Sequence, residues 1–256
     1  MNGFSSSAYR ELGSTGLRVS PIGLGTVKFG RNTDVKYPDA FELPDDAAVS
    51  KILDTARALG INLLDTAPAY GTAEERLGRL LGNREEWILS TKVGESYVDG
   101  RSTFDFTREA TERSIERSLG RLGTEWLDIV LVHSDGNDEA VIGQTDVLET
   151  LQRLQQQGKI RAIGVSTKTI TGGLLAVEIA DLVMVAYNET DQSQQPVLDR
   201  AAATGRGVLV KKALASGHST SPAEALRFVL GQPAVTSAVI GTINPSHLEA
   251  NVSSVL

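Results

Sequence analysis

The most informative stretch of the chain is Leu63-Leu64-Asp65-Thr66-Ala67-Pro68-Ala69-Tyr70-Gly71. In it, a largely apolar run ends at the carboxylate of Asp65, and a loop that contains Pro68, Tyr70 and Gly71 follows. A (β/α)₈ barrel builds its active site in this way, from residues at the carboxyl ends of buried strands and in the loops that follow them. We therefore expect Asp65 and Tyr70 to lie at a functional site.

Short apolar runs and amphipathic stretches alternate along the chain, which predicts alternating strands and helices. The predicted strands are 22–25, 61–64, 87–91, 127–132, 160–165, 182–186, 207–210 and 238–240. The predicted helices are 45–59, 73–81, 107–122, 147–157, 171–179, 196–204, 222–230 and 245–255, and a small hairpin, 12–20, precedes them all. This pattern predicts an α/β fold, a (β/α)₈ (TIM) barrel of ~250 residues with a short N-terminal β-hairpin, as a single domain, 1–256.

Several predicted helices carry recognisable end signals. Thr107 is expected to cap the N-terminus of 107–122, and Gly123 follows the last turn of that helix. Ser221 is expected to cap 222–230, with Pro222 in the first turn, where its missing N–H has no cost.

The main alternative fold is an open, doubly wound sheet, which would bind a dinucleotide at a Gly-x-Gly-x-x-Gly turn after its first strand. The corresponding stretch, 23–28, has Lys28 in place of the third glycine. Strands that are apolar throughout also suit a parallel sheet that is covered on both faces. Both observations favour the barrel.

Composition excludes several classes of protein. The 256 residues are 41% hydrophobic and carry a net charge of −7, which argues against a nucleic-acid or anionic-membrane partner. There is no cysteine, and the three histidines have no metal-ligand spacing, so a structural metal is not expected. No membrane-spanning run is present, and segment 1–10 is polar, so we expect a cytoplasmic location.

Four polar side chains follow three successive predicted strands. Asp65 and Tyr70 follow the second strand, Lys92 follows the third and His133 the fourth, so a barrel would bring them to one rim. Each has an ordinary structural interpretation when it is taken alone. Asp65 would cap a turn, Tyr70 would pack on the rim, Lys92 would lie at the surface, and His133 would be satisfied in the core.

Together the four residues predict proton transfer to a developing alkoxide. A free tyrosine has a pKa of about 10, and a neighbouring ammonium lowers it. Lys92 would therefore tune Tyr70, while Asp65 would keep Lys92 charged and His133 would orient a substrate carbonyl. No side chain can supply a hydride, whereas a nicotinamide cofactor can.

Seven motifs in order resemble those of the aldo-keto reductases. They are Pro21–Thr26, Leu64–Gly71, Ser90–Lys92, Ser118–Gly123, Leu127–His133, Gly158–Ser166 and Val239–Gly241. The resemblance implies a (β/α)₈ barrel that binds NADPH/NADP⁺ and reduces aldehydes and ketones. It also implies that the catalytic residues are Asp65, Tyr70, Lys92 and His133.

The same resemblance implies a set of cofactor contacts. Ser166 would bind the carboxamide, 211–217 would lie along the pyrophosphate, and 241–251 would hold the adenosine end at a helix N-terminus. The implied cofactor-binding residues are Gly25, Thr26, Asp65, Ser166, Lys211, Lys212, Leu214, Gly217, Gly241, Thr242, His247 and Asn251. Alternatively, the Lys211–Lys212 pair belongs to a solvated loop and His247 lies on an exposed helix face.

Some positions depart from the family pattern. Thr167 stands where the family commonly has Asn, and Ala250 stands where it commonly has Glu. Met184 stands in place of a Gln that binds the carboxamide, and Lys211 in place of an aromatic residue that stacks on the nicotinamide. NADH is therefore possible as well as NADPH.

The substrate end of the site is expected to be open, because the chain ends directly after the last predicted helix. We expect loops 29–43 and 95–106 to shape it, with Tyr97, Phe104 and Phe106 as substrate contacts or packing residues.

The first functional hypothesis is an NADPH-dependent oxidoreductase that acts on a small carbonyl compound, or on the corresponding alcohol or sugar. The alternatives are a nucleotide-binding regulatory barrel with little turnover, and a non-redox lyase or isomerase. The sequence does not indicate an oligomeric state.

Overall fold

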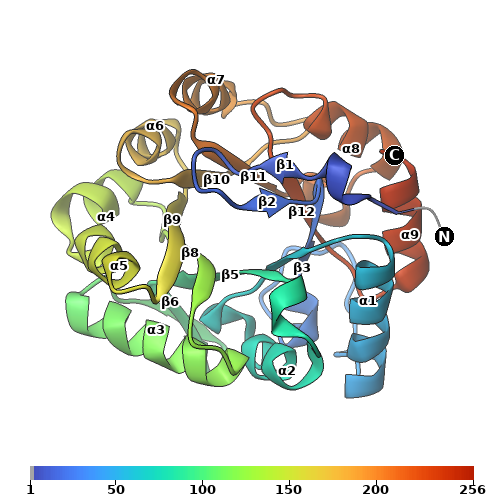
Figure 1. Ribbon diagram of the computed structural model, residues 1–256, viewed down its shortest axis with the longest axis horizontal. Coiled ribbons are helices and arrows are strands. Elements are labelled where there is room, and N and C mark those ends of the chain that lie inside the picture. The colour runs from blue at the N-terminus through green and yellow to red at the C-terminus, as the bar shows by residue number, and fades with distance from the viewer. Residues whose placement is uncertain (1–2) are drawn as a thin grey trace.

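In the computed structural model, which describes residues 3–256, parallel strands close into a barrel that helices surround (Figure 1). The barrel strands are β3 (Ile22–Gly25), β4 (Leu63–Asp65), β5 (Ile88–Val93), β8 (Leu127–His133), β9 (Ile160–Ser166), β10 (Leu182–Ala186), β11 (Gly207–Lys211) and β12 (Ser237–Gly241). Pairing of β12 with β3 closes the sheet. The predicted (β/α)₈ barrel is confirmed.

Helices connect successive strands and cover the outside of the barrel. They are α1 (Asp46–Ala58), α2 (Ala73–Leu80), α3 (Arg108–Leu122), α4 (Asp138–Gln144), α5 (Val147–Gln156), α6 (Ile170–Ile179), α7 (Gln195–Thr204), α8 (Pro222–Leu230) and α9 (Pro245–Ser253). Helix α4 was not predicted from the sequence. None of the helices in residues 3–256 combines the length and the apolar character that a membrane crossing requires.

The predicted N-terminal hairpin is present, and it covers the N-terminal end of the barrel. It pairs β1 (Arg10–Glu11) with β2 (Arg18–Val19), and Leu12, Leu17 and Val19 are almost completely buried. These side chains pack with residues inside the barrel, among them Leu131 and Met184. The interior is thus filled by side chains and closed at one end, which leaves the opposite end for a site.

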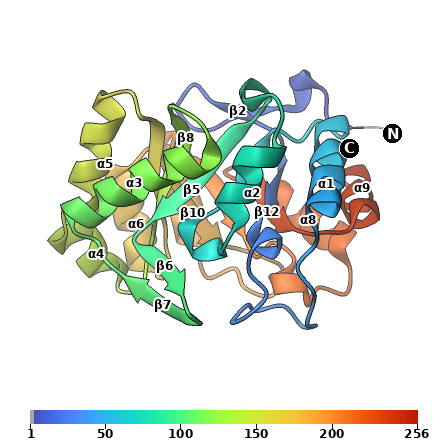
Figure 2. The same ribbon diagram turned by 90° about the horizontal axis from the view of Figure 1, so that it is seen from below.

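A second hairpin lies at the C-terminal end of the barrel. It pairs β6 (Glu95–Val98) with β7 (Arg101–Phe104), and Figure 2 shows it at the end opposite to β2. Segment 95–106 was predicted to be only a loop. The missed signal was Asp99-Gly100, whose φ angles of 52° and 75° form the tight turn that a two-residue hairpin needs.

The predicted helix ends are confirmed in α3 and corrected in α8. Thr107 accepts a hydrogen bond from the N–H of Ala110, and Gly123 ends α3 in the left-handed conformation. Ser221 does precede α8, but its side chain makes no capping hydrogen bond. Pro222 in the first turn removes one N–H that would otherwise need a partner.

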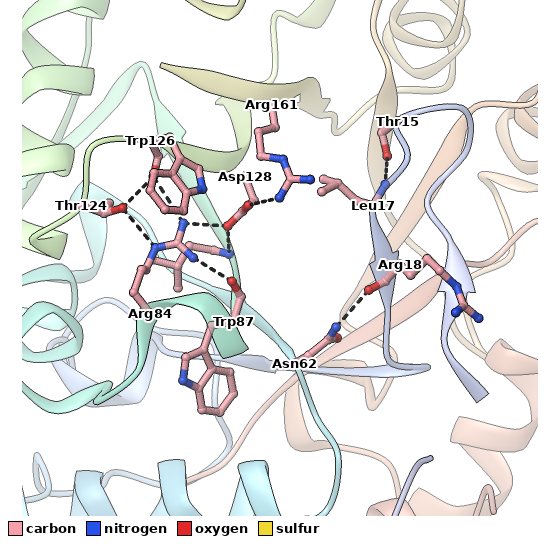
Figure 3. A network of polar contacts seen from close by, with 11 residues as sticks. Thr15, Leu17, Arg18, Asn62, Arg84, Trp87, Thr124, Trp126, Asp128 and Arg161 are labelled. Carbon is pink, nitrogen blue, oxygen red and sulfur yellow. Dashed lines mark hydrogen bonds and ion pairs between the residues drawn. The ribbon is translucent and has the colours of Figure 1, made fainter. Parts of the chain in front are cut away.

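A buried carboxylate joins three strands near the N-terminal end of the barrel (Figure 3). Asp128, at the start of β8, accepts hydrogen bonds from Arg84 Nη2 at 2.7 Å, Arg161 Nη1 at 3.0 Å and the N–H of Leu89 at 2.9 Å. Only 1% of the Asp128 side chain is exposed. Both carboxylate oxygens therefore have charged partners, and the cluster ties β5, β8 and β9 together.

Candidate active site

A cleft of about 650 Å³ opens at the C-terminal ends of the barrel strands, and all four predicted catalytic residues line it. Asp65 is the last residue of β4, Lys92 lies in β5, and His133 ends β8. Tyr70 lies in a single 3₁₀ turn, Pro68–Tyr70, which begins three residues after Asp65. The barrel thus brings together residues that are up to 68 positions apart in the sequence.

Asp65 and Lys92 form a buried ion pair. The Lys92 Nζ lies 2.7 Å from Asp65 Oδ2 and 2.8 Å from the Thr66 carbonyl oxygen, and Ser90 Oγ donates to Asp65 Oδ1 at 2.9 Å. The side chains of Lys92 and Asp65 are only 2% and 4% exposed. Burial lowers the pKa of Lys92, but the Asp65 carboxylate and Tyr70 outweigh burial, so the net pKa is raised. Lys92 is therefore held as an ammonium ion.

Tyr70 lies next to this ammonium. The Lys92 Nζ is 4.8 Å from the centroid of the Tyr70 ring, and the Tyr70 and His133 rings meet edge to face with centroids 6.3 Å apart. Burial raises the pKa of the Tyr70 hydroxyl, and Lys92 lowers it by less. Lys92 thus acts on the Tyr70 pKa in the predicted direction, but the net pKa is raised because loss of hydration outweighs the charge. The hydroxyl keeps its proton at neutral pH.

Glu95 is a charged residue of the site that the sequence analysis did not select. Its Oε2 lies 2.8 Å from His133 Nδ1, without the alignment of a good hydrogen bond. Burial raises the pKa of Glu95, but His133, Ser102 and Arg31 outweigh burial and bring it to about 2. Glu95 begins β6, so the missed Asp99-Gly100 turn was the signal that could have found it.

His133 remains neutral at pH 7. Burial lowers its pKa, as do Lys92 and Lys211, whereas Glu95 raises it by less. A neutral imidazole can donate one hydrogen bond without adding a charge beside the substrate.

The predicted cofactor residues fall into two groups. Those that line the cleft are Gly25, Thr26, Asp65, Ser166, Lys211, Lys212, Leu214, Gly217 and Gly241. Three others, Thr242, His247 and Asn251, lie outside its lining, with His247 exposed on α9. Asn244 caps α9 by accepting a hydrogen bond from the N–H of Ser246.

The loop after β11 has an unusual backbone. Lys212, Ala215, Ser216 and Gly217 have φ angles of 58°, 48°, 59° and 94°. Left-handed conformations are costly for residues other than glycine, and they concentrate where a backbone is shaped for a ligand. The same loop carries Lys212, whose pKa is lowered by burial and then by Lys36.

Tyr37 lies across this part of the cleft. A Cβ built on Gly241 would come within 2.8 Å of the Tyr37 hydroxyl, and one on Gly217 within 3.7 Å of its ring. The Lys28 Nζ lies 4.0 Å from the Tyr37 ring centroid, and Phe41 packs against the ring edge at 5.7 Å. Loop 29–43 was expected to shape the substrate end, whereas Tyr37 contacts two glycines that were assigned to the cofactor.

The three aromatic residues proposed as substrate contacts differ in their positions. Phe104 lines the cleft. Tyr97 is not among the lining residues but lies behind two of them: its hydroxyl donates a hydrogen bond to Asp34 at 2.8 Å, and Arg31 lies 3.5 Å from its ring centroid. Phe106 packs against the core and against Gly94.

No cluster of His, Cys, Asp or Glu side chains within residues 3–256 is arranged to hold a metal ion. The cleft instead carries an excess of cations. Arg31, Lys36, Lys168, Lys211 and Lys212 line it, in a chain whose net charge is −7. The lining therefore favours an anionic ligand.

Comparison with known proteins agrees with this geometry. The sequence pattern of the "Aldo/keto reductase family" matches residues 21–220. A Pseudomonas aeruginosa protein assigned to the aldo-keto reductases is 50% identical, with a TM-score of 0.90 over 97% of this chain and 94% of that one. L-galactose dehydrogenase of Arabidopsis thaliana is 29% identical, covering 96% of this chain and 87% of that enzyme. D-threo-aldose 1-dehydrogenase of a Pseudomonas species is 27% identical, covering 89% and 76%. The chain therefore belongs to the aldo/keto reductase family of oxidoreductases.

Proposed function

We propose that the protein is an NADPH-dependent oxidoreductase that reduces a small aldehyde or ketone, or oxidises the corresponding alcohol or sugar. The observation that carries this proposal is the convergence of Tyr70, the Lys92–Asp65 ion pair and His133 in one cleft. This set contains a proton donor, a fixed positive charge and a neutral hydrogen-bond donor. Reduction of a carbonyl group needs these groups, together with a source of hydride.

In the proposed reaction, His133 and Tyr70 bind the carbonyl oxygen and align it. The cofactor, when bound, supplies a hydride to the carbonyl carbon. Tyr70 then gives its hydroxyl proton to the developing alkoxide, so that an alcohol forms and a phenolate remains. The Lys92 ammonium stabilises that phenolate, and Asp65 keeps Lys92 charged and in place. Oxidation of an alcohol is the same sequence in reverse.

The residues present fit a nicotinamide cofactor with phosphate groups. Thr167 has a buried hydroxyl with no hydrogen-bond partner within residues 3–256, and it directly follows Ser166, the residue that we assign to the carboxamide. Lys36, Lys212 and the left-handed loop 212–217 lie further along the cleft, where the pyrophosphate would be held. The nucleotide would thus cross the cleft from Ser166 to Gly241. The lysines favour NADPH, with NADH as the alternative.

Two sugar dehydrogenases among the relatives support an alcohol or sugar as the substrate in the reverse direction. The second candidate function is a nucleotide-binding barrel with little turnover. The complete set of four catalytic residues argues against it.

The test is a titration with NADPH followed by fluorescence, and then a panel of aldehydes and sugars followed by the near-ultraviolet absorbance of the reduced nucleotide. We expect Tyr70→Phe to lower kcat by about 10²- to 10⁴-fold while NADPH binding is kept. Unchanged turnover in Tyr70→Phe would exclude its role as acid. Binding of NADPH without turnover of any compound would favour the regulatory barrel.

A further inference from the structure

Lys211 is a cation of the cleft that the proposed proton transfer does not use. It is the last residue of β11, and its Nζ donates to Ser166 Oγ at 2.8 Å and to the Thr167 carbonyl oxygen at 2.9 Å. These two bonds fix the ammonium on the wall of the cleft beside Ser166. Its third N–H has no acceptor within residues 3–256.

The electrostatic surroundings of Lys211 are the reverse of those of Lys92. Lys92 has the Asp65 carboxylate at 2.7 Å, whereas Lys211 forms no ion pair within the described residues. Burial lowers the pKa of Lys211, and repulsion from Lys212 and Lys92 adds to this, giving a value of about 7. The ammonium is therefore sensitive to any further charge placed beside it.

The hydride donor has to lie close to this ammonium, an argument that rests on the proposed function. The reacting carbon of the cofactor must come within about 3–3.5 Å of the carbonyl carbon, whose oxygen contacts Tyr70 and His133. The carboxamide on the same ring is assigned to Ser166, which Lys211 contacts directly. The ring is thereby confined between Tyr70 and the wall that Ser166 and Lys211 form.

We propose that Lys211 discriminates between the two redox states of the cofactor. The nicotinamide ring is a cation in NADP⁺ and is neutral in NADPH, and the two nucleotides are otherwise alike. The Lys211 ammonium repels the cationic ring and leaves the neutral ring unaffected. It therefore weakens binding of the oxidised nucleotide, promotes its release and biases the bound reaction toward carbonyl reduction.

The size of the effect follows from the distance between two like charges. At contact distances and an effective dielectric constant of about 20, the repulsion corresponds to at least a tenfold difference in Kd, and about 10- to 100-fold is expected after screening. The phosphate groups are common to both nucleotides. Their contribution therefore cancels in the ratio of Kd for NADP⁺ to Kd for NADPH, which makes this ratio the quantity to measure.

The discrimination depends on pH because Lys211 has to be protonated. Below pH 7, Lys211 is mostly protonated in the free protein. NADP⁺ then binds either after Lys211 has lost its proton or against the repulsion of the ammonium, and both weaken binding. The Kd ratio should therefore rise as pH falls from about 8.5 to 6, by at most tenfold per pH unit. NADPH binding releases no proton from Lys211.

Other charged groups face Lys211, and they do not produce the same signature. They are Lys92 of β5, His133 of β8, Asp138 of α4, Lys168 after β9 and Lys212 after β11. The raised pKa of Lys92 and the lowered pKa of Asp138 keep both charged across this pH range. The pKa values of His133 and Lys212 are both lowered, and both residues are kept in Lys211→Met, so a pH dependence that Lys211→Met removes belongs to Lys211.

The experiment compares wild type with Lys211→Met and Lys211→Arg. NADPH binding is followed by its fluorescence, and NADP⁺ binding by displacement of NADPH, at pH 6, 7 and 8.5. We expect Lys211→Met to lower the Kd ratio at pH 6 by about 10- to 100-fold and to remove its pH dependence. Arginine keeps the charge at every pH, so Lys211→Arg should keep a high ratio that no longer falls at pH 8.5.

Lys168→Met is the matched control, because Lys168 lines the same cleft and the side-chain hydrogen bond to Ser166 comes from Lys211. At pH 6, where Lys211 is protonated with or without Lys168, its Kd ratio should stay close to that of wild type. The inference is overturned if wild type and Lys211→Met show the same ratio at pH 6, or if Lys168→Met lowers the ratio as much as Lys211→Met. Failure of wild type to bind NADPH would overturn the proposed function as well, whereas NADPH binding with an unchanged ratio would overturn only the role of Lys211.

Discussion

The two ends of this barrel both bury charged side chains, but they differ in how completely these charges are paired. At the N-terminal end, Asp128 has two arginines and a backbone N–H as partners. At the C-terminal end, Lys92 is paired with Asp65, whereas Lys211 has no carboxylate partner within residues 3–256. A buried charge whose partners all belong to the protein stabilises the fold. A buried charge without an opposite charge beside it indicates where a ligand would bind.

The two ends of the barrel also explain why two polar residues of the same sequence motif have different surroundings. Asp128 and His133 belong to the same motif and the same strand, β8. They lie near opposite ends of that strand, so one serves the closed end of the barrel and the other faces the cleft. The position of a residue along a barrel strand therefore indicates whether it has a structural or a chemical role.

The largest effect should come from breaking the Lys92–Asp65 ion pair, which is buried and which we propose to act in catalysis. Lys92→Met leaves the Asp65 carboxylate buried without its partner, which should lower the free energy of unfolding by about 3–5 kcal/mol. It also removes the charge that stabilises the Tyr70 phenolate, so we expect kcat to fall by about 10²- to 10⁴-fold. Urea denaturation and steady-state kinetics measure the two effects.

The double variant Asp65→Asn with Lys92→Met is the control for this prediction. It removes both charges, so it should recover part of the lost stability while kcat remains low. If Lys92→Met unfolds at the same urea concentration as wild type, the buried Asp65 carboxylate does not need the charge of Lys92, and the prediction is wrong.

The closed end of the barrel should respond in stability alone. Asp128→Asn removes the charge that Arg84 and Arg161 share, and we expect the free energy of unfolding to fall by about 3 kcal/mol. The kcat/KM of the folded enzyme should be unchanged, because Asp128 lies at the opposite end of β8 from the cleft. Arg161→Gln is the matched control, since Arg161 is 50% exposed, and it should cost less than about 1 kcal/mol. A loss of kcat/KM in Asp128→Asn would contradict this separation of the two ends.

Much of this organisation could be predicted from the sequence. Apolar runs and helix caps such as Thr107 are local signals, and they predicted the barrel strands and most helices. The positions of Asp65, Tyr70, Lys92 and His133 then followed, because the carboxyl ends of parallel strands share one rim. Their convergence needed only the topology, although their catalytic roles remain a proposal.

The features that were missed depend on contacts between distant segments. The Glu95–His133 contact requires the β6–β7 hairpin to fold back over the rim, and only the Asp99-Gly100 turn indicates this locally. The raised pKa of Tyr70 depends on how much protein encloses its hydroxyl, which no motif encodes. The position of Tyr37 over Gly241 likewise depends on the path of a long loop.

The charge of Glu95 can be removed by lowering the pH, so its contribution to the stability of the cleft can be measured. Its pKa is about 2 in the folded protein, against an ordinary value of 4.5. The ionised Glu95 carboxylate is therefore more stable in the folded protein than in the unfolded chain. The resulting stability is complete above pH 4.5 and is lost as pH falls toward 2. We therefore expect wild type to be more stable than Glu95→Gln at pH 6, by about 2 kcal/mol after solvent screening.

The measurement is chemical denaturation of both proteins at pH 6 and at pH 3. The difference between them should shrink at the lower pH, because Glu95 takes up a proton when the wild-type protein unfolds. Changes in other carboxylates are common to the two proteins and cancel in the comparison. A difference that is independent of pH would mean that the folded protein does not lower the pKa of Glu95.

The smallest effect should come from Tyr37, an uncharged residue beside Gly217 and Gly241, in the part of the cleft that we propose to hold the cofactor. Its ring bridges Gly217 and Gly241 and is held in place by Lys28. An aromatic contact of this kind contributes about 1 kcal/mol, so we expect Tyr37→Ala to speed NADPH dissociation about five- to tenfold. Tyr37→Phe keeps the ring, so NADPH should dissociate from this variant at nearly the wild-type rate. Stopped-flow fluorescence measures both rates, and equal rates in wild type and Tyr37→Ala would show that segment 35–41 does not retain the nucleotide. Because kcat of Tyr37→Ala should not fall, this variant also separates retention of the cofactor from the chemistry of Tyr70 and Lys92.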